Sequence, residues 1–141
     1  MYKAISNTMH SQLTDWGLLI LRISTGALMM THGLPKLTGF SQIVADGQFI
    51  PVLGSIWLGL ALTVMAEFFM SMFLIAGLLT RISVIPLIIT MLVAVFVAHA
   101  NDPFSVKEHA LLFLFPYFTL LLAGPGRFSV DYFLAGNYKK S

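Results

Sequence analysis

The chain has 141 residues, of which 57% are hydrophobic and 10% are charged, with a formal net charge of +2 and no cysteine. Because soluble domains carry about 25% charged residues, this composition indicates a membrane protein. The lack of cysteine excludes disulfides, Cys-ligated zinc, iron–sulfur clusters and thiol chemistry by this chain. The basic residues are few and scattered, so we expect no nucleic-acid partner.

Four apolar segments follow one another along the chain. They run over about residues 16–34, 56–79, 82–98 and 108–123. Each is long enough to cross a hydrocarbon core of about 30 Å as a helix. The sequence therefore predicts an all-α fold in which residues 1–141 form a single integral membrane domain, a bundle of four transmembrane helices.

The orientation follows from the lysines and arginines outside the spans, which concentrate on the cytoplasmic side of membrane proteins. With four spans, one side holds both termini and the second connection, with Lys3, Arg81, Arg127, Lys139 and Lys140. The other side holds Lys36 and Lys107. This asymmetry predicts an N-in, C-in topology. On the outer side, the connection 37–55 is mildly apolar, and we expect it to fold back onto the bundle as a lid or re-entrant segment.

Two ionisable residues, Arg22 and Glu67, lie inside the apolar segments, where such side chains are costly and rare. A rise of about 1.5 Å per residue places Arg22 about 9 Å and Glu67 about 18 Å above the inner face. A long arginine side chain spans that difference, so we predict an intramembrane Arg22–Glu67 pair. Such a pair either contacts a substrate, a proton or a quinone, or only fixes how the helices pair.

Further polar residues gather near the outer end. His32 and Lys36 share one face of the first helix with Arg22, and His99 lies at the depth of His32. We expect a polar track from this outer end down to Arg22, and interpret Asp102 and His109 as interfacial caps. The candidate catalytic residues are Glu67, His32 and Arg22, and the candidate substrate-binding residues are Lys36, His99 and Glu108.

This polar set meets the chemical needs of a quinone site. Quinone reduction requires apolar walls, a hydrogen-bond donor for each carbonyl and nearby proton donors. A metal site is not predicted, because the three histidines and two glutamates near this end lack the i, i+3 or i, i+4 spacing of a dedicated ligand set. Haem ligation by His32 and His99 across the bundle rests on that one pair of residues, and we do not expect it.

Three motifs in chain order resemble the DoxX family of small bacterial membrane proteins. They are Leu21-Arg22 with His32-Gly33-Leu34-Pro35-Lys36, then Glu67 with Gly77-Leu78-Leu79-Thr80-Arg81, and finally Gly124-Pro125-Gly126-Arg127-Phe128-Ser129-Val130-Asp131. The resemblance covers about residues 18–131. The positions that it carries over are Arg22, His32, Gly33, Lys36, Glu67, Arg81, Glu108, Gly124, Gly126 and Asp131.

The resemblance implies a four-helix protein of the bacterial inner membrane. Relatives of this kind serve as the membrane subunit of a thiosulfate:quinone oxidoreductase, or join superoxide dismutase and a sulfurtransferase in defence against oxidative stress. We therefore predict a quinone-interacting membrane component of an oxidoreductase that works with soluble redox or sulfurtransferase partners. Two alternatives stay open: a small proton-coupled transporter, which with four helices would have to be a homo-oligomer, and a non-catalytic membrane anchor or assembly subunit of a redox complex.

Overall fold

Helices make up the regular secondary structure that the structure describes, apart from one isolated bridge between Val52 and Ser55. The computed structural model describes residues 2–47 and 49–138, and the side chains of residues 12–47 and 49–136. In chain order the elements are α1 (Tyr2–Thr38), α2 (Phe40–Asp46), α3 (Ile56–Val64), the π-helix η1 (Met65–Met70), α4 (Ser71–Ala76), α5 (Thr80–Val93), the π-helix η2 (Ala94–Ala98), α6 (Phe104–Ala123) and α7 (Val130–Tyr138).

Four helical stretches are long and apolar enough to span a membrane. They are Gln12–Thr38, Ile56–Ala76, Thr80–Ala98 and Phe104–Ala123. The predicted all-α fold with four transmembrane helices is confirmed. The first helix continues through Pro35, where we expected an end, because a membrane helix tolerates proline when its neighbours re-satisfy the freed backbone groups. The second ends at Ala76, because Gly77 takes a left-handed conformation with a φ of 69°.

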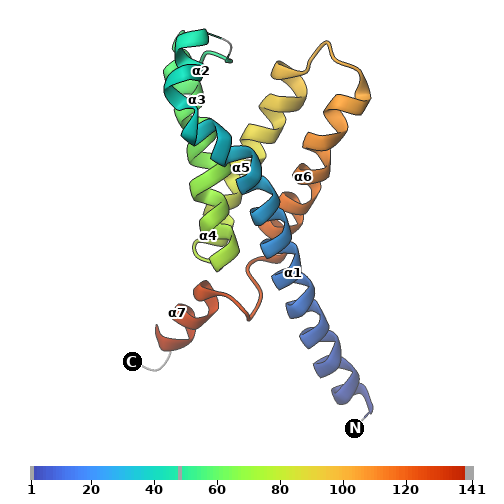
Figure 1. Cartoon of the computed structure of the whole chain (residues 1–141). Coiled ribbons are helices and arrows are strands. Elements are labelled where there is room, and N and C mark those ends of the chain that lie inside the picture. The colour runs from blue at the N-terminus through green and yellow to red at the C-terminus, as the bar shows by residue number, and fades with distance from the viewer. Residues whose placement is uncertain (1, 48, 139–141) are drawn as a thin grey trace.

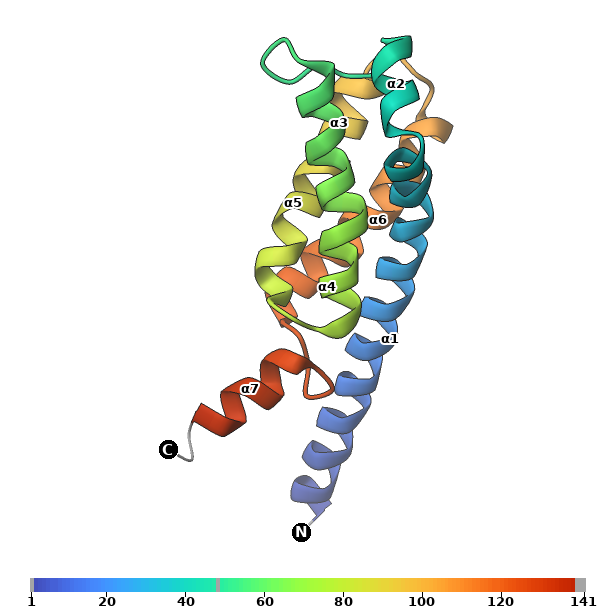
Figure 2. The same cartoon turned by 60° about the vertical axis from the view of Figure 1, so that its left-hand side comes forward.

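The spans lie side by side with alternating direction (Figures 1 and 2). The segments α3, η1 and α4 form one continuous rod beside α1, while α5 with η2 pairs with α6 as an antiparallel hairpin. Both termini lie at the same end of the bundle, which we call the terminal end; the opposite end, with α2, is the loop end. Which end faces the cytoplasm stays a prediction, and the side chains of Lys3, Lys139 and Lys140 lie outside the described residues.

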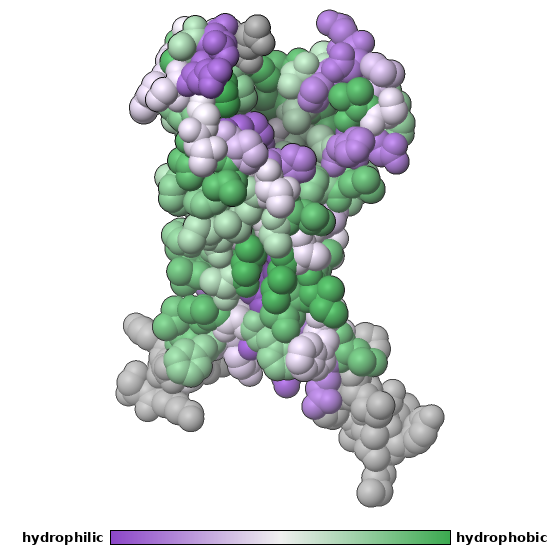
Figure 3. Space-filling model, in the orientation of Figure 1, coloured by the Kyte–Doolittle hydropathy of each residue, from purple (hydrophilic) through white to green (hydrophobic). Residues whose placement is uncertain are grey.

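The centre of the bundle is packed with fully buried side chains, among them Leu60, Leu74, Leu87, Tyr117 and Leu120. The outward faces of the spans are also apolar. On the face drawn in Figure 3, apolar residues cover the middle of the bundle and hydrophilic residues lie at the loop end. A surface with this pattern suits a hydrocarbon environment, in which apolar side chains face both the core and the lipid.

Two glycines of α1 set its register against the neighbouring rod. A Cβ built on Gly26 would lie 2.6 Å from Cγ1 of Ile75, and one built on Gly33 would lie 2.8 Å from the backbone carbonyl carbon of Glu67. Small residues at such contacts let membrane helices approach closely. The contact at Gly33 places Glu67 level with the loop-end part of α1.

The connection 37–55 folds back onto the bundle, as we expected. After α2 the chain lies against α3 so closely that a Cβ on Gly59 would be 2.1 Å from the carbonyl oxygen of Ile50. The ring of Phe40 also meets that of Trp57, at 5.9 Å between centroids. This segment covers one side of the loop end.

Candidate functional site

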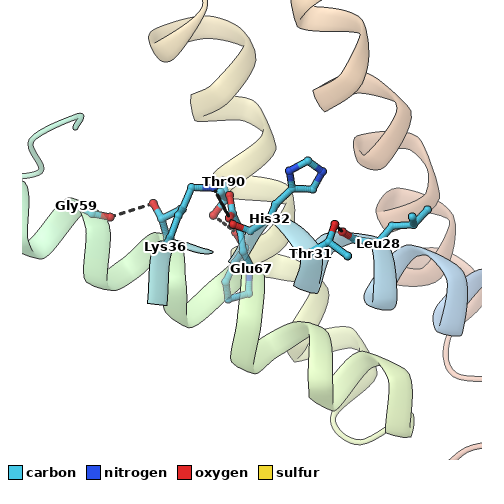
Figure 4. Close-up of polar contacts among 9 residues, drawn as sticks. Leu28, Thr31, His32, Lys36, Gly59, Glu67 and Thr90 are labelled. Carbon is cyan, nitrogen blue, oxygen red and sulfur yellow. Dashed lines mark hydrogen bonds and ion pairs between the residues drawn. The ribbon is translucent and has the colours of Figure 1, made fainter. Parts of the chain in front are cut away.

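The central feature of the loop end is an ion pair between Lys36 of α1 and Glu67 of η1. The Lys36 Nζ lies 2.5 Å from Oε2 of Glu67 and 3.5 Å from the carbonyl oxygen of His32 (Figure 4). The Glu67 side chain is only 6% exposed, whereas that of Lys36 is 28% exposed. A carboxylate so deeply buried requires a partner, because an isolated charge in an apolar interior costs several kcal/mol.

The predicted Arg22–Glu67 pair is wrong. In the part of the chain that the structure describes, Glu67 pairs with Lys36, and Arg22 forms no ion pair with it. The reason is helix register: the close contact of Gly33 with Glu67 puts eleven residues of α1, about 16 Å of rise, between Arg22 and the level of the carboxylate. The depths counted from the ends of the apolar segments did not include this offset between α1 and the neighbouring helix.

Arg22 instead ties together the terminal end. It is fully buried, and its guanidinium donates to the carbonyl oxygen of Leu74, at 3.4 Å, and to that of Phe128. Leu74 lies in the last turn of α4, where a cation interacts favourably with the helix dipole. Residue 77 favours glycine, because its φ is 69° and because a Cβ there would overlap the Arg22 guanidinium and the Cβ of Ser129.

Two cavities lie on either side of the Lys36–Glu67 pair. The first, of about 140 Å³, reaches all four spans and is lined by Met29, His32, Lys36, Glu67, Met91, Ala94, His99, Val106, His109, Ala110 and Phe113. The second, of about 190 Å³, lies under the connection 37–55 and is lined by Lys36, Phe49, Ile50, Val52, Gly59, Thr63, Glu67, Thr90, Val93, Ala94, Ala98 and His99. The ion pair, Ala94 and His99 belong to both cavities, so the pair stands at their boundary.

Four of the six predicted site residues meet here: Glu67, His32, Lys36 and His99 all line the first cavity. Arg22 lines neither cavity, and Glu108 is exposed on α6 without lining either one. The roles assigned to these residues stay predictions, and the position of Glu108 outside both cavities gives no support to a role in binding. Among the described residues, no group of three or more His, Asp or Glu side chains is placed to hold a metal ion.

The histidines have distinct surroundings. His32 lies edge-on to Phe113, at 5.8 Å between ring centroids, and Nδ1 of His99 is 2.7 Å from Oδ2 of Asp102. His109, which we interpreted as a cap, also lines the first cavity. No signal in the sequence indicated this contact, because the rotation of α6 decides that His109 and not Glu108 lines the cavity.

Both π-helical segments adjoin the site. Glu67 lies within η1, and His99 directly follows η2. Such local widening of a helix is frequent at functional sites. It changes which side chains face the bundle interior, and a 3.6-residue period cannot predict it.

Below the pair, two buried hydroxyl groups have no hydrogen-bond partner among the described residues. They are Oγ of Ser71, one turn along the rod from Glu67, and the Tyr117 hydroxyl of α6. The Tyr117 ring stacks on Phe113 of the first cavity, at 6.2 Å between centroids. Buried polar groups normally find a partner, so these two can accept a water molecule or a polar group of a ligand.

A family profile described as DoxX matches residues 17–100, more than half of the chain. The chain belongs to the DoxX family. The inner membrane protein YqjF of Escherichia coli (strain K12) is 28% identical over 126 residues, which cover 85% of this chain and 93% of YqjF. No solved structure matches the chain. Together with the four apolar spans, these findings confirm the predicted location of this DoxX protein, a bacterial inner membrane that it crosses several times.

The last DoxX-like motif, residues 124–131, has a structural role. Gly124 and Gly126 both have positive φ angles, 83° and 73°, and turn the chain from α6 towards α7. Ser129 Oγ accepts from the Tyr132 N–H at 3.1 Å and so caps the start of α7. The carboxylate of Asp131 accepts from the N–H groups of Leu79 and Thr80, at 2.7 and 2.9 Å, and caps the start of α5.

Proposed function

We propose that this DoxX protein is the quinone-interacting membrane component of an oxidoreductase, and that a quinone ring binds in the cavities beside the Lys36–Glu67 pair. The observation that carries the proposal is the buried ion pair at the boundary of two apolar-walled cavities. A structural ion pair that only fixed helix register would need no adjoining space. A hydrophobic ligand with two polar oxygens suits such a site.

The apolar walls and the polar groups of the cavities contact different parts of the quinone. In the first cavity, Met29, Met91 and Phe113 offer apolar and aromatic surface to a planar ring. Hydrogen-bond donors for the carbonyl oxygens come from the Lys36 ammonium and the imidazole of His32 or His99. Each cavity is smaller than the roughly 300–1,000 Å³ of typical ligand sites. Movement of the Lys36 side chain would join the two cavities into one site near that range.

Reduction of a quinone to a quinol adds two electrons and two protons, so that both carbonyl oxygens become hydroxyls. Glu67 lies at the boundary of the cavities, and we assign it a proton relay: it takes up a proton from water and passes it on, once for each of the two quinone oxygens, while Lys36 orients a carbonyl oxygen. The electrons come from a soluble redox partner, because the chain has no cysteine and shows no electron-carrier motif of its own. On the basis of the family resemblance, we propose a partner in sulfur oxidation or in the defence against oxidative stress.

Quinone binding to the protein in lipid nanodiscs tests the proposal. The variants are Glu67→Gln, which keeps the shape of the side chain, and His32→Ala. Glu108→Gln is the matched control, because it makes the same change on α6 at an exposed position outside the cavities. We expect both site variants to weaken quinone binding at least tenfold while Glu108→Gln binds like the wild type.

A folded wild type that binds no quinone would reject the proposal and favour a transporter or a membrane anchor. Proton flux into vesicles that stops in Glu67→Gln but not in Glu108→Gln would then identify a carrier. Absence of both quinone binding and proton flux would favour a non-catalytic membrane anchor.

A further inference from the structure

A separate cavity of the described residues lies at the terminal end, away from the Lys36–Glu67 pair. Its volume is about 570 Å³, within the roughly 300–1,000 Å³ range of ligand sites. It is bounded by α1, the start of α5, the turn at residues 125–127 and α7. Its side chains include the guanidinium groups of Arg81 and Arg127 together with Leu79, Ile82 and Tyr132.

Among the charged side chains that line this cavity, one cation has no ion-pair partner in the described residues. The carboxylate of Asp131 is occupied by the backbone N–H groups of Leu79 and Thr80. Arg127 pairs with Asp15, with 3.5 Å between Nε and Oδ2. Among the ion pairs of the described residues none includes Arg81, which only donates a 3.4 Å hydrogen bond to the carbonyl oxygen of Leu122. An exposed guanidinium without a carboxylate partner is a ready ligand for a phosphate.

The apolar part of the cavity lies where a membrane interface is expected. The cavity adjoins the first residues of the α5 span, and Ile82 is 60% exposed beside Arg81. Trp16 and Phe128 pack together nearby, at 4.6 Å between ring centroids, and Tyr132 on α7 is also exposed. Aromatic residues of this kind mark the headgroup region of a bilayer. The short helix α7, with exposed aromatic and leucine side chains, suits the same interfacial position.

We propose that this terminal-end cavity binds the phosphate group of an anionic membrane phospholipid. Arg81 contacts the phosphate, and an acyl chain runs along Ile82 and the outer face of α5. The charge left free on Arg81, the volume of the cavity and its place at the end of the spans support this site. It is independent of the quinone proposal.

Tryptophan quenching by brominated lipids tests this site, because Trp16 lies next to Asp15, which lines the cavity. The protein carries Trp57→Phe, so that Trp16 is the sole reporter, and is placed in phosphatidylcholine vesicles with a minor fraction of brominated phosphatidylglycerol. Brominated phosphatidylcholine in parallel vesicles gives the reference. We expect the anionic lipid to be enriched near Trp16 by about fivefold for each arginine that contacts its phosphate.

Arg81→Gln should remove this enrichment, and Arg81→Lys should restore most of it. Lys107→Gln is the control, since it removes one positive charge at the loop end and should leave the quenching of Trp16 unchanged. Equal enrichment in wild type and Arg81→Gln would overturn the proposal. Loss of the enrichment on addition of inorganic phosphate would overturn the lipid assignment and identify a soluble phosphate compound as the ligand.

Discussion

Gly33 of α1 contacts the backbone of Glu67 so closely that no other residue fits without movement of a helix. A Cβ at residue 33 would lie 2.8 Å from both the carbonyl carbon of Glu67 and the amide nitrogen of Phe68. One turn further along α1, Lys36 reaches the Glu67 carboxylate. The glycine therefore positions the ion pair, and its presence within the DoxX-like motif has a steric reason.

Gly33→Ala should destabilise the protein by about 1–3 kcal/mol, because the added methyl group overpacks the contact with η1. Unfolding of the purified protein in detergent measures the change. Gly17→Ala is the matched control in the same helix, since no atom lies within 4 Å of a Cβ at residue 17. There alanine should stabilise by up to about 1 kcal/mol, as helix propensity predicts. Equal effects at both positions would refute the steric explanation.

Removal of one partner of the Lys36–Glu67 pair should lower the free energy of unfolding more than removal of both partners. Lys36→Met leaves a buried carboxylate without a partner, and Glu67→Gln leaves an ammonium facing an amide; such changes cost up to about 3–5 kcal/mol for fully buried pairs. Because Lys36 is partly exposed, we expect values at or below the lower end of that range. The double variant should recover part of the loss. Strictly additive unfolding free energies would show that the pair contributes no coupling.

Arg22→Met should lower the free energy of unfolding by about 3 kcal/mol, because the buried carbonyl group of Leu74 and the partly buried one of Phe128 lose a charged donor. Arg127→Met, at an exposed ion pair, should cost less than about 1 kcal/mol. The fraction of Arg22→Met that folds should bind quinone as the wild type does, since Arg22 lines neither cavity of the loop end. If the variant does not fold, Arg22→Lys permits the same comparison. Weaker quinone binding by the folded variant would indicate that Arg22 contributes to the quinone site.

Tyr117→Phe should leave the free energy of unfolding unchanged or raise it by about 1 kcal/mol, because the buried hydroxyl has no partner in the described structure. Thermal unfolding in the absence of ligand measures this change. Tyr132→Phe, at an exposed position on α7, supplies the comparison and should have no effect. A marked loss of stability in Tyr117→Phe would indicate that the hydroxyl is hydrogen-bonded to a buried water molecule in the folded protein.

The sequence predicted which residues form the site better than it predicted which of them pair with each other. His32, Lys36, Glu67 and His99 come together because each lies near the same level of its span, and depth follows from counting residues along helices. The pairing of Lys36 with Glu67, and not Arg22 with Glu67, depended on a shift of several residues between α1 and its neighbour. Two glycine contacts decide that shift, and no hydropathy pattern contains them. The contact of His109 with the first cavity likewise depends on the rotation of α6.

Hydropathy and segment length by themselves determined that this protein is all-helical and crosses the membrane four times, because a bilayer requires about 20 apolar residues for each spanning helix. The motif residues also determined the family. Only the tertiary structure decided that Arg22 and Asp131 bind the ends of other helices, that two cavities flank a single ion pair, and that Arg81 faces a large cavity at the terminal end. These features arise from contacts between residues distant in sequence, and the close approach of helices fixes them through packing rather than through local propensity.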